Sequence, residues 1–252
     1  MTTMTTFNVL LQRREEVAQG TTAFHYDKPV GFTFKPGQAV DLILPSRPTT
    51  EIGEAAQAAE ISNGRHAFSI VSAPFESELV VATRMRDSVF KRALKALPIG
   101  SSAQLDGPFG SLTLHNARAR PAVFIAGGIG VTPFMSMLRQ AAKDHLPQAL
   151  VLLYSNRRPE DSAFLAELQQ LERDNKHFRL VATMTEMGAS KLPWHGETRL
   201  IDEALVRQIG NELSAPIYYL AGPPGMVGAI QSILNGAGIN EDDVRSEEFY
   251  GY

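Results

Sequence analysis

The chain has 252 residues, which corresponds to one or two domains. It carries 24 Lys and Arg against 27 Asp and Glu, and this net charge of −3 argues against sequence-independent nucleic-acid binding, which needs a strongly positive surface. No cysteine occurs, so disulfides, thiolate catalysis and cysteine-bound zinc or iron–sulfur centres are excluded within these residues. The sequence shows no long apolar run and no secretory signal, so we expect a cytoplasmic protein without a membrane span.

The first half of the chain is a series of short strands separated by Gly and Pro. The expected strands are residues 7–12, 21–26, 38–44, 66–72, 79–84 and 103–105. Strands this closely spaced predict an antiparallel barrel or sandwich. Residues 88–97 differ, because Val89, Leu94 and Leu97 recur at helical spacing behind Ser88, a favourable N-cap residue. The polar stretch 45–64 is too long for a tight hairpin turn, and its role stays open.

Past residue 116, continuous apolar runs alternate with amphipathic segments. The expected strands are residues 123–126, 150–154, 178–183 and 217–221, and the expected helices are residues 134–142, 161–173, 201–209 and 225–234. Buried strands that alternate with helices predict a parallel sheet. We therefore predict a two-domain chain, with an N-terminal antiparallel β-barrel at 1–116 followed by an α/β parallel-sheet domain at 117–252.

Two glycine-bearing turns lie in the second half. Gly127-Gly128-Ile129-Gly130 follows the first expected strand, with Thr132 as a candidate N-cap and Pro133 suited to the first helical turn. The segment 222–226 follows the last expected strand. Either turn alone is explained by strand–helix packing, but two of them at the carboxyl ends of parallel strands favour a ligand site, where helix N-termini bind phosphate.

Basic residues occur at two further places. Arg157 and Arg158 follow the second expected strand, where arginine pairs with a nucleotide 2′-phosphate, although a solvated basic turn explains them equally. Lys91, Arg92 and Lys95 lie on the helix at 88–97 and suit either a solvated face or an acidic docking partner. The sequence contains no Gly-x-Ser-x-Gly and no P-loop, and its histidines show no metal-ligand spacing, so we expect no metal site.

Five ordered motifs make the sequence similar to the ferredoxin–NADP reductase superfamily, whose members join a flavin-binding barrel to a nicotinamide-nucleotide-binding α/β domain. They are residues 65–69 (Arg-x-[Tyr/Phe]-Ser), 107–110 (Gly-Pro-x-Gly), 127–133 (Gly-Gly-x-Gly-x-Thr-Pro), 221–226 (Cys-Gly-Pro-Pro-x-Met) and 247–249 (a closing acidic–aromatic segment). Ala221 stands in place of the Cys, and residues 86–88 replace the glycine-rich FAD turn of many relatives.

The resemblance implies a role for each matching residue. On the flavin side, Arg65 would bind the flavin phosphate, and Arg84 and Ser88 would lie near the second FAD phosphate. Phe68 would pack on the flavin, Ser69 would approach its N5, and Phe249 would cover the isoalloxazine. Glu247 would be a proton or hydrogen-bond partner. On the nucleotide side, Gly128, Gly130 and Thr132 would bind the pyrophosphate, Arg157 the adenosine end, and Gly222, Pro223 and Met226 the nicotinamide. The expected catalytic residues are Ser69, Glu247 and Phe249.

The implied activity is that of a flavin-dependent NAD(P)H oxidoreductase. Hydride would pass from NAD(P)H to flavin N5, and electrons would then pass to a separate protein such as ferredoxin or flavodoxin, since the cysteine-free chain holds no iron–sulfur domain of its own. FAD is favoured over FMN, and Arg157 and Arg158 favour NADPH over NADH. The alternatives are a free-flavin or ferric-chelate reductase, or a non-catalytic flavin-binding electron-transfer subunit of a larger complex.

Overall fold

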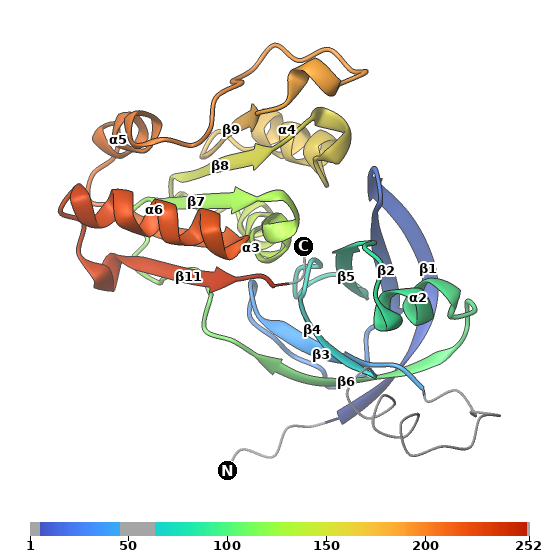
Figure 1. Ribbon diagram of the computed structural model, residues 1–252. Helices are drawn as coiled ribbons and strands as arrows, with labels where there is room; N and C mark the ends of the chain where they lie inside the picture. Colours follow the sequence, from blue (N-terminus) through green and yellow to red (C-terminus); the bar gives the residue numbers. More distant parts are fainter. Residues whose placement is uncertain (1–5, 46–63, 251–252) are drawn as a thin grey trace.

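The computed structural model describes residues 6–45 and 64–250, and its first part is an antiparallel sheet in the order β4-β3-β6-β1-β2-β5. The strands are β1 (Thr6–Ala18), β2 (Thr21–Asp27), β3 (Ala39–Ile43), β4 (Arg65–Ser69), β5 (Glu78–Arg84) and β6 (Ser102–Phe109). The sheet curls (Figure 1), and a bridge between Ile70 and Val81 joins its two edges. The predicted antiparallel barrel is therefore confirmed. Most of the polar stretch 45–64 lies outside the described residues.

Alternating side chains fill the interior of this barrel. Phe24 and Tyr26 of β2 and Leu79 and Val81 of β5 are fully buried in one apolar cluster. Successive side chains of a strand point to opposite faces, so residues two apart share the inner face. The alternation of apolar residues that predicted the strands therefore also places these side chains in the core.

Helix α2 (Val89–Ala96) packs against the barrel. The Ser88 hydroxyl accepts a hydrogen bond from the Lys91 backbone N–H at 3.1 Å, which confirms the predicted N-cap. Phe90 and Leu94, one turn apart, are buried in the barrel core. Their burial fixes the orientation of α2, and with it the direction of the charged side chains between them.

The second part of the chain is a parallel sheet in the order β11-β10-β7-β8-β9. Its strands are β7 (Ala122–Gly127), β8 (Leu150–Asn156), β9 (Phe178–Met184), β10 (Ile217–Gly222) and β11 (Val244–Glu248). The predicted parallel sheet is confirmed, and four of its strands lie where continuous apolar runs predict them. β11 was not predicted as a strand, because its sequence Val-Arg-Ser-Glu-Glu carries no apolar run.

Helices cover both faces of the parallel sheet. They are α3 (Thr132–Lys143), α4 (Leu165–Asp174), α5 (Glu203–Asn211) and α6 (Pro224–Gly236). Phe124 of β7 packs in the cluster that holds α3 and α4, whereas its neighbour Val123 packs in the cluster that holds α5 and α6. Strands buried on both faces read as unbroken apolar runs, which is why the sequence indicated them.

Helix α4 begins later than predicted. Its first residue is Leu165 rather than Asp161, because Phe164 has a left-handed backbone with φ of 60°. Asp161 ends a short 3₁₀ turn, Pro159–Asp161, and its carboxylate is bound by arginines rather than capping the helix. The apolar periodicity extends across this break, so periodicity alone does not locate it.

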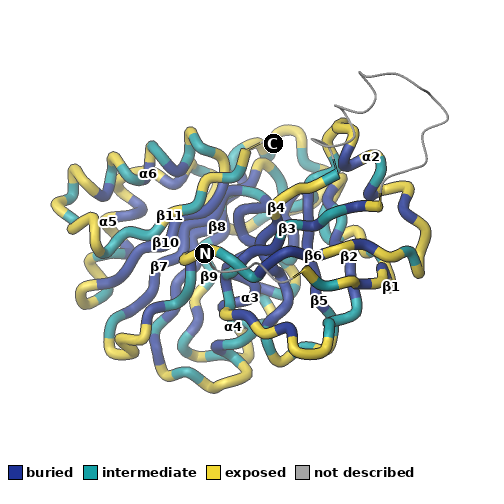
Figure 2. Tube along the Cα trace, turned by 90° about the horizontal axis from the view of Figure 1, so that it is seen from below, coloured by how far each residue is buried: buried dark blue, intermediate teal, exposed yellow. Residues whose placement is uncertain are grey.

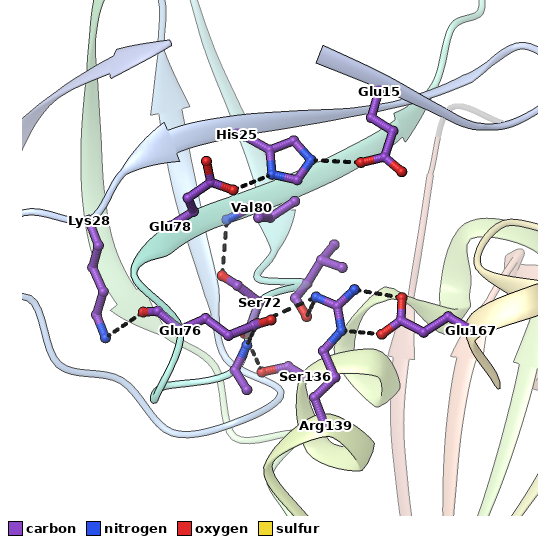
Figure 3. Close-up of polar contacts among 12 residues, drawn as sticks. Glu15, His25, Lys28, Ser72, Glu76, Glu78, Val80, Ser136, Arg139 and Glu167 are labelled. Atoms are coloured by element: carbon purple, nitrogen blue, oxygen red, sulfur yellow. Dashed lines mark hydrogen bonds and ion pairs between the residues drawn. The ribbon is translucent and has the colours of Figure 1, made fainter. Parts of the chain in front are cut away.

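Polar contacts join the two sheets along α3 (Figure 3). The Ser136 hydroxyl donates to the Ser72 carbonyl oxygen at 2.7 Å. Arg139 binds Glu167 of α4, with Nε 2.6 Å from Oε1, and reaches Glu76 of the segment between β4 and β5 at 3.4 Å. These contacts hold α3 against the segment between β4 and β5.

The central strands β7 and β10 are buried along their whole length, and α5 and α6 alternate between buried and exposed residues along the outside (Figure 2). Among the helices of the described residues, α6 is the longest, with 13 residues. In residues 6–45 and 64–250, no helix combines the length and the apolar character needed to cross a membrane.

Candidate active site between the two sheets

A cavity of about 270 Å³ lies where the antiparallel sheet meets the parallel sheet. One wall comes from β4, β5 and α2, and the other from Thr132 at the start of α3 and from residues 247–250. In Figure 1, β11 points toward β4, so the chain that follows it reaches the barrel. The cavity brings together segments separated by most of the sequence.

Five predicted site residues meet in this cavity, namely Phe68, Ser69, Thr132, Glu247 and Phe249. The first two lie on β4, and the last two lie at the end of β11 and just after it. Their convergence requires both sheets to be in place. The cavity is therefore the candidate active site.

Ser69 is buried without a hydrogen-bond partner. It is 6% exposed, and its Oγ makes no hydrogen bond to any residue in the described part of the chain. A buried hydroxyl left unsatisfied costs about 1–3 kcal/mol. Because Ser69 lines the cavity, a polar atom of a ligand there would supply the missing partner.

Phe68 faces the barrel core as well as the cavity. Its ring stacks on His66, with centroids 4.9 Å apart and an interplanar angle of 26°, and lies 5.9 Å from Phe90 of α2. The side chain is 7% exposed. Phe68 thus supports the cavity wall, and its contact with a flavin stays a prediction.

The arginine of the flavin signature lies one residue further from the aromatic in this chain than in the signature. Arg65 stands three residues before Phe68, whereas the signature places arginine two residues before the aromatic, the position that His66 holds here. Arg65 binds Asp41 and Asp106 at 2.6 and 2.7 Å, and it is absent from the cavity walls that His66 helps to form. Two carboxylates thus bind the Arg65 guanidinium, and the assignment of Arg65 to the flavin phosphate stays a prediction.

The segment after β10 and β11 closes the other wall. β11 pairs with β10 so that Ala221 faces Glu247, and the Phe249 N–H donates to the Gly222 carbonyl oxygen at 2.9 Å. Burial raises the pKa of the Glu247 carboxyl. The aromatic and the carboxyl predicted from the closing motif thus line the cavity together.

The two glycine turns pack on each other. A Cβ at Gly130 would collide with the Ala221 carbonyl, and one at Gly127 would meet the Met226 side chain. Gly128 has φ of +54° and faces open space. Gly130 therefore serves close strand–helix packing, whereas Gly128 leaves room for a ligand backbone to approach. The contribution of Gly222, Pro223 and Met226 to a nicotinamide site stays a prediction.

Thr132 does not cap α3, contrary to prediction. The N-cap is Val131, and the Thr132 hydroxyl donates to the Ile129 carbonyl oxygen at 3.0 Å inside the preceding 3₁₀ turn, Gly128–Val131. Pro133 does lie in the first turn of α3, as predicted. Thr132 lines the cavity with a hydroxyl that already has an acceptor.

The predicted phosphate arginines separate into two groups. Arg84 and Arg158 both bind Asp161, each with an Nη2–Oδ1 distance of 3.0 Å, so they link β5 to the turn after β8. Arg157 is exposed beside them. Ser88 is occupied as the cap of α2. Of these residues, Arg157 has the side chain most accessible to an incoming nucleotide.

Sequence reasoning did not assign to the site the two basic residues that line the cavity, His66 and Lys91. Lys91 was grouped with a basic helix face, but it is 7% exposed, and Arg92 pairs with Asp87. The signal was present in the helical period, because Lys91 lies between Phe90 and Leu94 on the face that turns inward. The continuous basic face expected on α2 is therefore not formed.

The sequence is similar to known oxidoreductases. Residues 124–232 match the family model described as oxidoreductase NAD-binding domain. The chain is 29% identical over 228 residues to the reductase component of propane 2-monooxygenase from Rhodococcus jostii, covering 88% of this chain and 57% of that protein. It is also 29% identical over 227 residues to ferredoxin–NADP reductase B from Sorangium cellulosum, covering 86% of each.

A solved ferredoxin–NADP⁺ reductase from Neisseria gonorrhoeae, with bound FAD and NADP, has the same fold, with a TM-score of 0.75 at 20% identity over 96% of this chain and 98% of that one. The barrel, the parallel sheet and the order of the two are those of the ferredoxin–NADP reductase fold. In sequence, the chain is similar to reductase components of oxygenases and to a ferredoxin–NADP reductase. It spans 57 to 61% of the length of several oxygenase reductase components that it matches.

Proposed function

We propose that this protein is a flavin-dependent NAD(P)H oxidoreductase that passes electrons to a separate protein acceptor. The observation that carries the proposal is the cavity between the sheets, where the unsatisfied Ser69 hydroxyl, the Phe249 ring and the Glu247 carboxyl meet. It lies beside the glycine turn that opens the matched NAD-binding region. Relatives named as reductase components and as a ferredoxin–NADP reductase support the same activity.

The residues present fit a flavin. A flavin ring carries polar atoms at its edge and an extended aromatic face, which suit the Ser69 hydroxyl and the Phe249 ring. The bound flavin would accept hydride from NAD(P)H and release electrons to the acceptor. We propose FAD as the cofactor, in line with the FAD named in the Neisseria structure, and FMN as the less favoured alternative.

The chain's own residues would position the reactants. Ser69 would orient the flavin by a hydrogen bond, and Glu247, whose pKa is raised by burial, would place its carboxyl in the same cavity as a hydrogen-bond partner. Phe249 occupies the wall nearest β10, so its side chain would move aside when a nicotinamide ring enters. Catalysis would then rest on holding the two rings in contact rather than on strong acid–base chemistry.

On the nucleotide side, we place the pyrophosphate at Gly128 and the start of α3, with Gly130 and Thr132 as the supporting turn. The open space at Gly128 and the N-terminus of a long helix support this placement. Arg157 would meet the adenosine end, and its exposed guanidinium favours NADPH over NADH. Arg158, held by Asp161, would act indirectly by holding this turn.

We also propose that the two sheets correspond to two domains, residues 1–116 for the flavin and 117–252 for NAD(P). β6 ends at Phe109 and β7 begins at Ala122, so the boundary falls in the connecting segment. Within that segment, His115 Nδ1 lies 2.7 Å from the Tyr219 hydroxyl of β10. The connection is thus attached to the parallel sheet.

The acceptor would be a protein such as ferredoxin or flavodoxin. The names of the oxygenase reductase relatives favour a protein acceptor over a diffusible one. A cytoplasmic location is proposed from the cysteine-free composition, which suits a reducing compartment.

Anaerobic titration tests the activity. The purified full chain should carry a flavin absorption band, which bleaches stoichiometrically with NADPH or NADH, and the extracted flavin should be FAD. A bound flavin that neither nucleotide bleaches would refute the reductase and favour a non-catalytic electron-transfer subunit. A colourless protein that oxidises NAD(P)H only with added flavin or ferric chelate would favour the free-flavin or ferric-chelate reductase.

A further inference from the structure

Ser136 of α3 forms a fully buried hydrogen bond to the barrel side of the molecule. Its hydroxyl donates to the Ser72 carbonyl oxygen at 2.7 Å, and both residues are 0% exposed (Figure 3). A serine inside a helix commonly faces solvent or donates to the carbonyl four residues earlier in its own helix. Ser136 instead joins α3 to the segment between β4 and β5.

The two ends of this bond lie close to the two walls of the cavity. Ser69 stands three residues before Ser72, and Thr132 stands one helical turn before Ser136. Ser69 and Thr132 line opposite walls. Ser72 is itself fixed to β5, because its Oγ accepts the Val80 N–H at 3.0 Å. The bond therefore connects the wall of β4 and β5 to the wall at the start of α3 through short, regular segments.

The surfaces around the bond are apolar. Val71 and Val80 on the barrel side belong to one buried cluster with Phe134 and Leu138 of α3. Apolar burial is non-directional, so it favours contact between α3 and the barrel without fixing where the helix lies along it. A hydrogen bond depends on distance and angle, so the bond from Ser136 selects one position of α3.

Arg139, three residues further along α3, supports the same position. Its guanidinium reaches the Val71 carbonyl oxygen and the Glu76 carboxylate, each at 3.4 Å, and binds Glu167 of α4 at 2.6 Å. Residues three apart lie on the same face of a helix, so Ser136 and Arg139 contact the segment after β4 together. The side chain of Arg139 is only 16% exposed, and Figure 3 shows it between Glu76 and Glu167.

We propose that Ser136 is a positioning residue for hydride transfer, because its bond to Ser72 sets the spacing between the two walls of the cavity. The inference rests on the proposed function, in which a hydride, that is a proton with two electrons, leaves C4 of the nicotinamide and joins N5 of the flavin. The nicotinamide is thereby oxidised and the flavin reduced. Transfer needs the two rings about 3–3.5 Å apart, and a misplacement of about 1 Å costs about a hundredfold in rate.

Ser136→Ala tests the proposal in the full chain loaded with flavin. Its matched control is Ser162→Ala, because Ser162 is 4% exposed and its hydroxyl donates to the Arg158 carbonyl oxygen at 2.9 Å, within the parallel-sheet part alone. Ser136→Cys keeps a weak donor and is the milder change. Stopped-flow bleaching at saturating NADPH or NADH gives the limiting rate of flavin reduction. The long-wavelength charge-transfer absorption between flavin and nicotinamide reports ring contact without turnover.

In Ser136→Ala we expect the limiting rate to fall about tenfold, a part of the loss for a full misplacement, and the charge-transfer absorption to weaken. The dissociation constants of flavin and of NADP⁺ should stay within about twofold, the pattern of an interaction needed only for the reaction step. Ser136→Cys should lie between wild type and Ser136→Ala, and it carries the same test if Ser136→Ala does not retain flavin. Ser162→Ala should lose comparable stability and keep the limiting rate.

An unchanged limiting rate in Ser136→Ala, or an equal fall in Ser162→Ala, would overturn the proposal, because the hydroxyl of Ser136 would then serve stability alone. A wild-type chain whose flavin neither nucleotide bleaches would instead refute the proposed function. The two failures are therefore distinguishable.

Discussion

Arg84 of the barrel donates a hydrogen bond to Asp161 of the parallel-sheet part, with Nη2 3.0 Å from Oδ1. The same carboxylate accepts from Arg158 Nε at 2.9 Å, and the Asp161 side chain is only 6% exposed. One buried carboxylate is thus shared by two arginines that sequence reasoning placed at different ligand phosphates. Their common partner makes them a link between β5 and the turn after β8.

We expect Asp161→Asn to destabilise the protein by about 3–5 kcal/mol, because it leaves two arginines beside a neutral amide. The hydrogen bond from Arg158 is the main cause that lowers the pKa of Asp161 below 3.8. Its contribution is therefore complete above that ordinary value and is lost as the pH falls through the lower folded value. Denaturant unfolding at neutral and acid pH measures this, with exposed Asp242→Asn as control. Equal stability of both variants would contradict the link.

Ser69→Ala and Ser72→Ala should differ in their effect on the stability of the apoprotein. Ser69 Oγ has no partner among the described residues, so its removal should leave the free energy of unfolding unchanged or raise it by about 1 kcal/mol. Ser72 Oγ accepts the Val80 N–H at 3.0 Å, so its removal should cost about 1–2 kcal/mol. In flavin titrations, Ser69→Ala should bind flavin more weakly. Loss of stability in Ser69→Ala would show that the hydroxyl has a structural partner.

Glu247 should make the protein less stable as the pH rises. Its folded pKa is raised by burial, so the folded state binds the proton more tightly than the unfolded state does. Stability then falls as the pH rises from the ordinary value of 4.5 through the raised folded value, and stays lower above it. Glu247→Gln should remove this fall and unfold at higher denaturant at neutral pH. Exposed Glu241→Gln is the control, and an unchanged pH profile in Glu247→Gln would exclude the buried carboxyl as its source.

Gly130→Ala and Gly128→Ala should distinguish a glycine needed for strand–helix packing from a glycine needed for the approach of a ligand. A methyl at 130 would collide with the Ala221 carbonyl and come within 2.7 Å of the Gly222 Cα, so we expect a loss of about 3 kcal/mol. At 128 the space is open and only the φ of +54° opposes a side chain, which costs about 1 kcal/mol. Gly128→Ala should therefore weaken nucleotide binding clearly while it lowers the stability of the protein only slightly. Comparable stability of the two variants would contradict this division of roles.

Arg157→Ala should change the KM for NADPH, whereas Arg158→Ala should change the stability of the protein. Arg157 is exposed, so its removal should raise the KM for NADPH about tenfold and leave the KM for NADH and the stability nearly unchanged. Arg158 is bound to Asp161, so its removal should lower stability first. Steady-state kinetics with both nucleotides, beside thermal unfolding, distinguish the two. Equal effects of Arg157→Ala on NADPH and NADH would refute the assignment of Arg157 to the 2′-phosphate.

The sequence by itself determined the local elements and their class. The period of two around Phe24 and Tyr26 identified barrel strands, the unbroken run at 123–126 identified a strand buried on both faces, and Ser88 marked the start of α2. These features depend on neighbours within a few residues, so composition and spacing are enough to predict them. The ordered motifs added the resemblance to ferredoxin–NADP reductases, because glycine turns and a closing aromatic are equally local.

Only the tertiary structure decided which polar groups face the cavity. Arg65 turns to Asp41 and Asp106, which lie 24 and 41 residues away, and Arg84 meets Asp161 across 77 residues. β11 forms a strand because β10 pairs with it, although its own sequence has little strand character. Such partners depend on register and on the packing of the two sheets, and a shift of one residue along β4 exchanges Arg65 for His66 at the cavity wall.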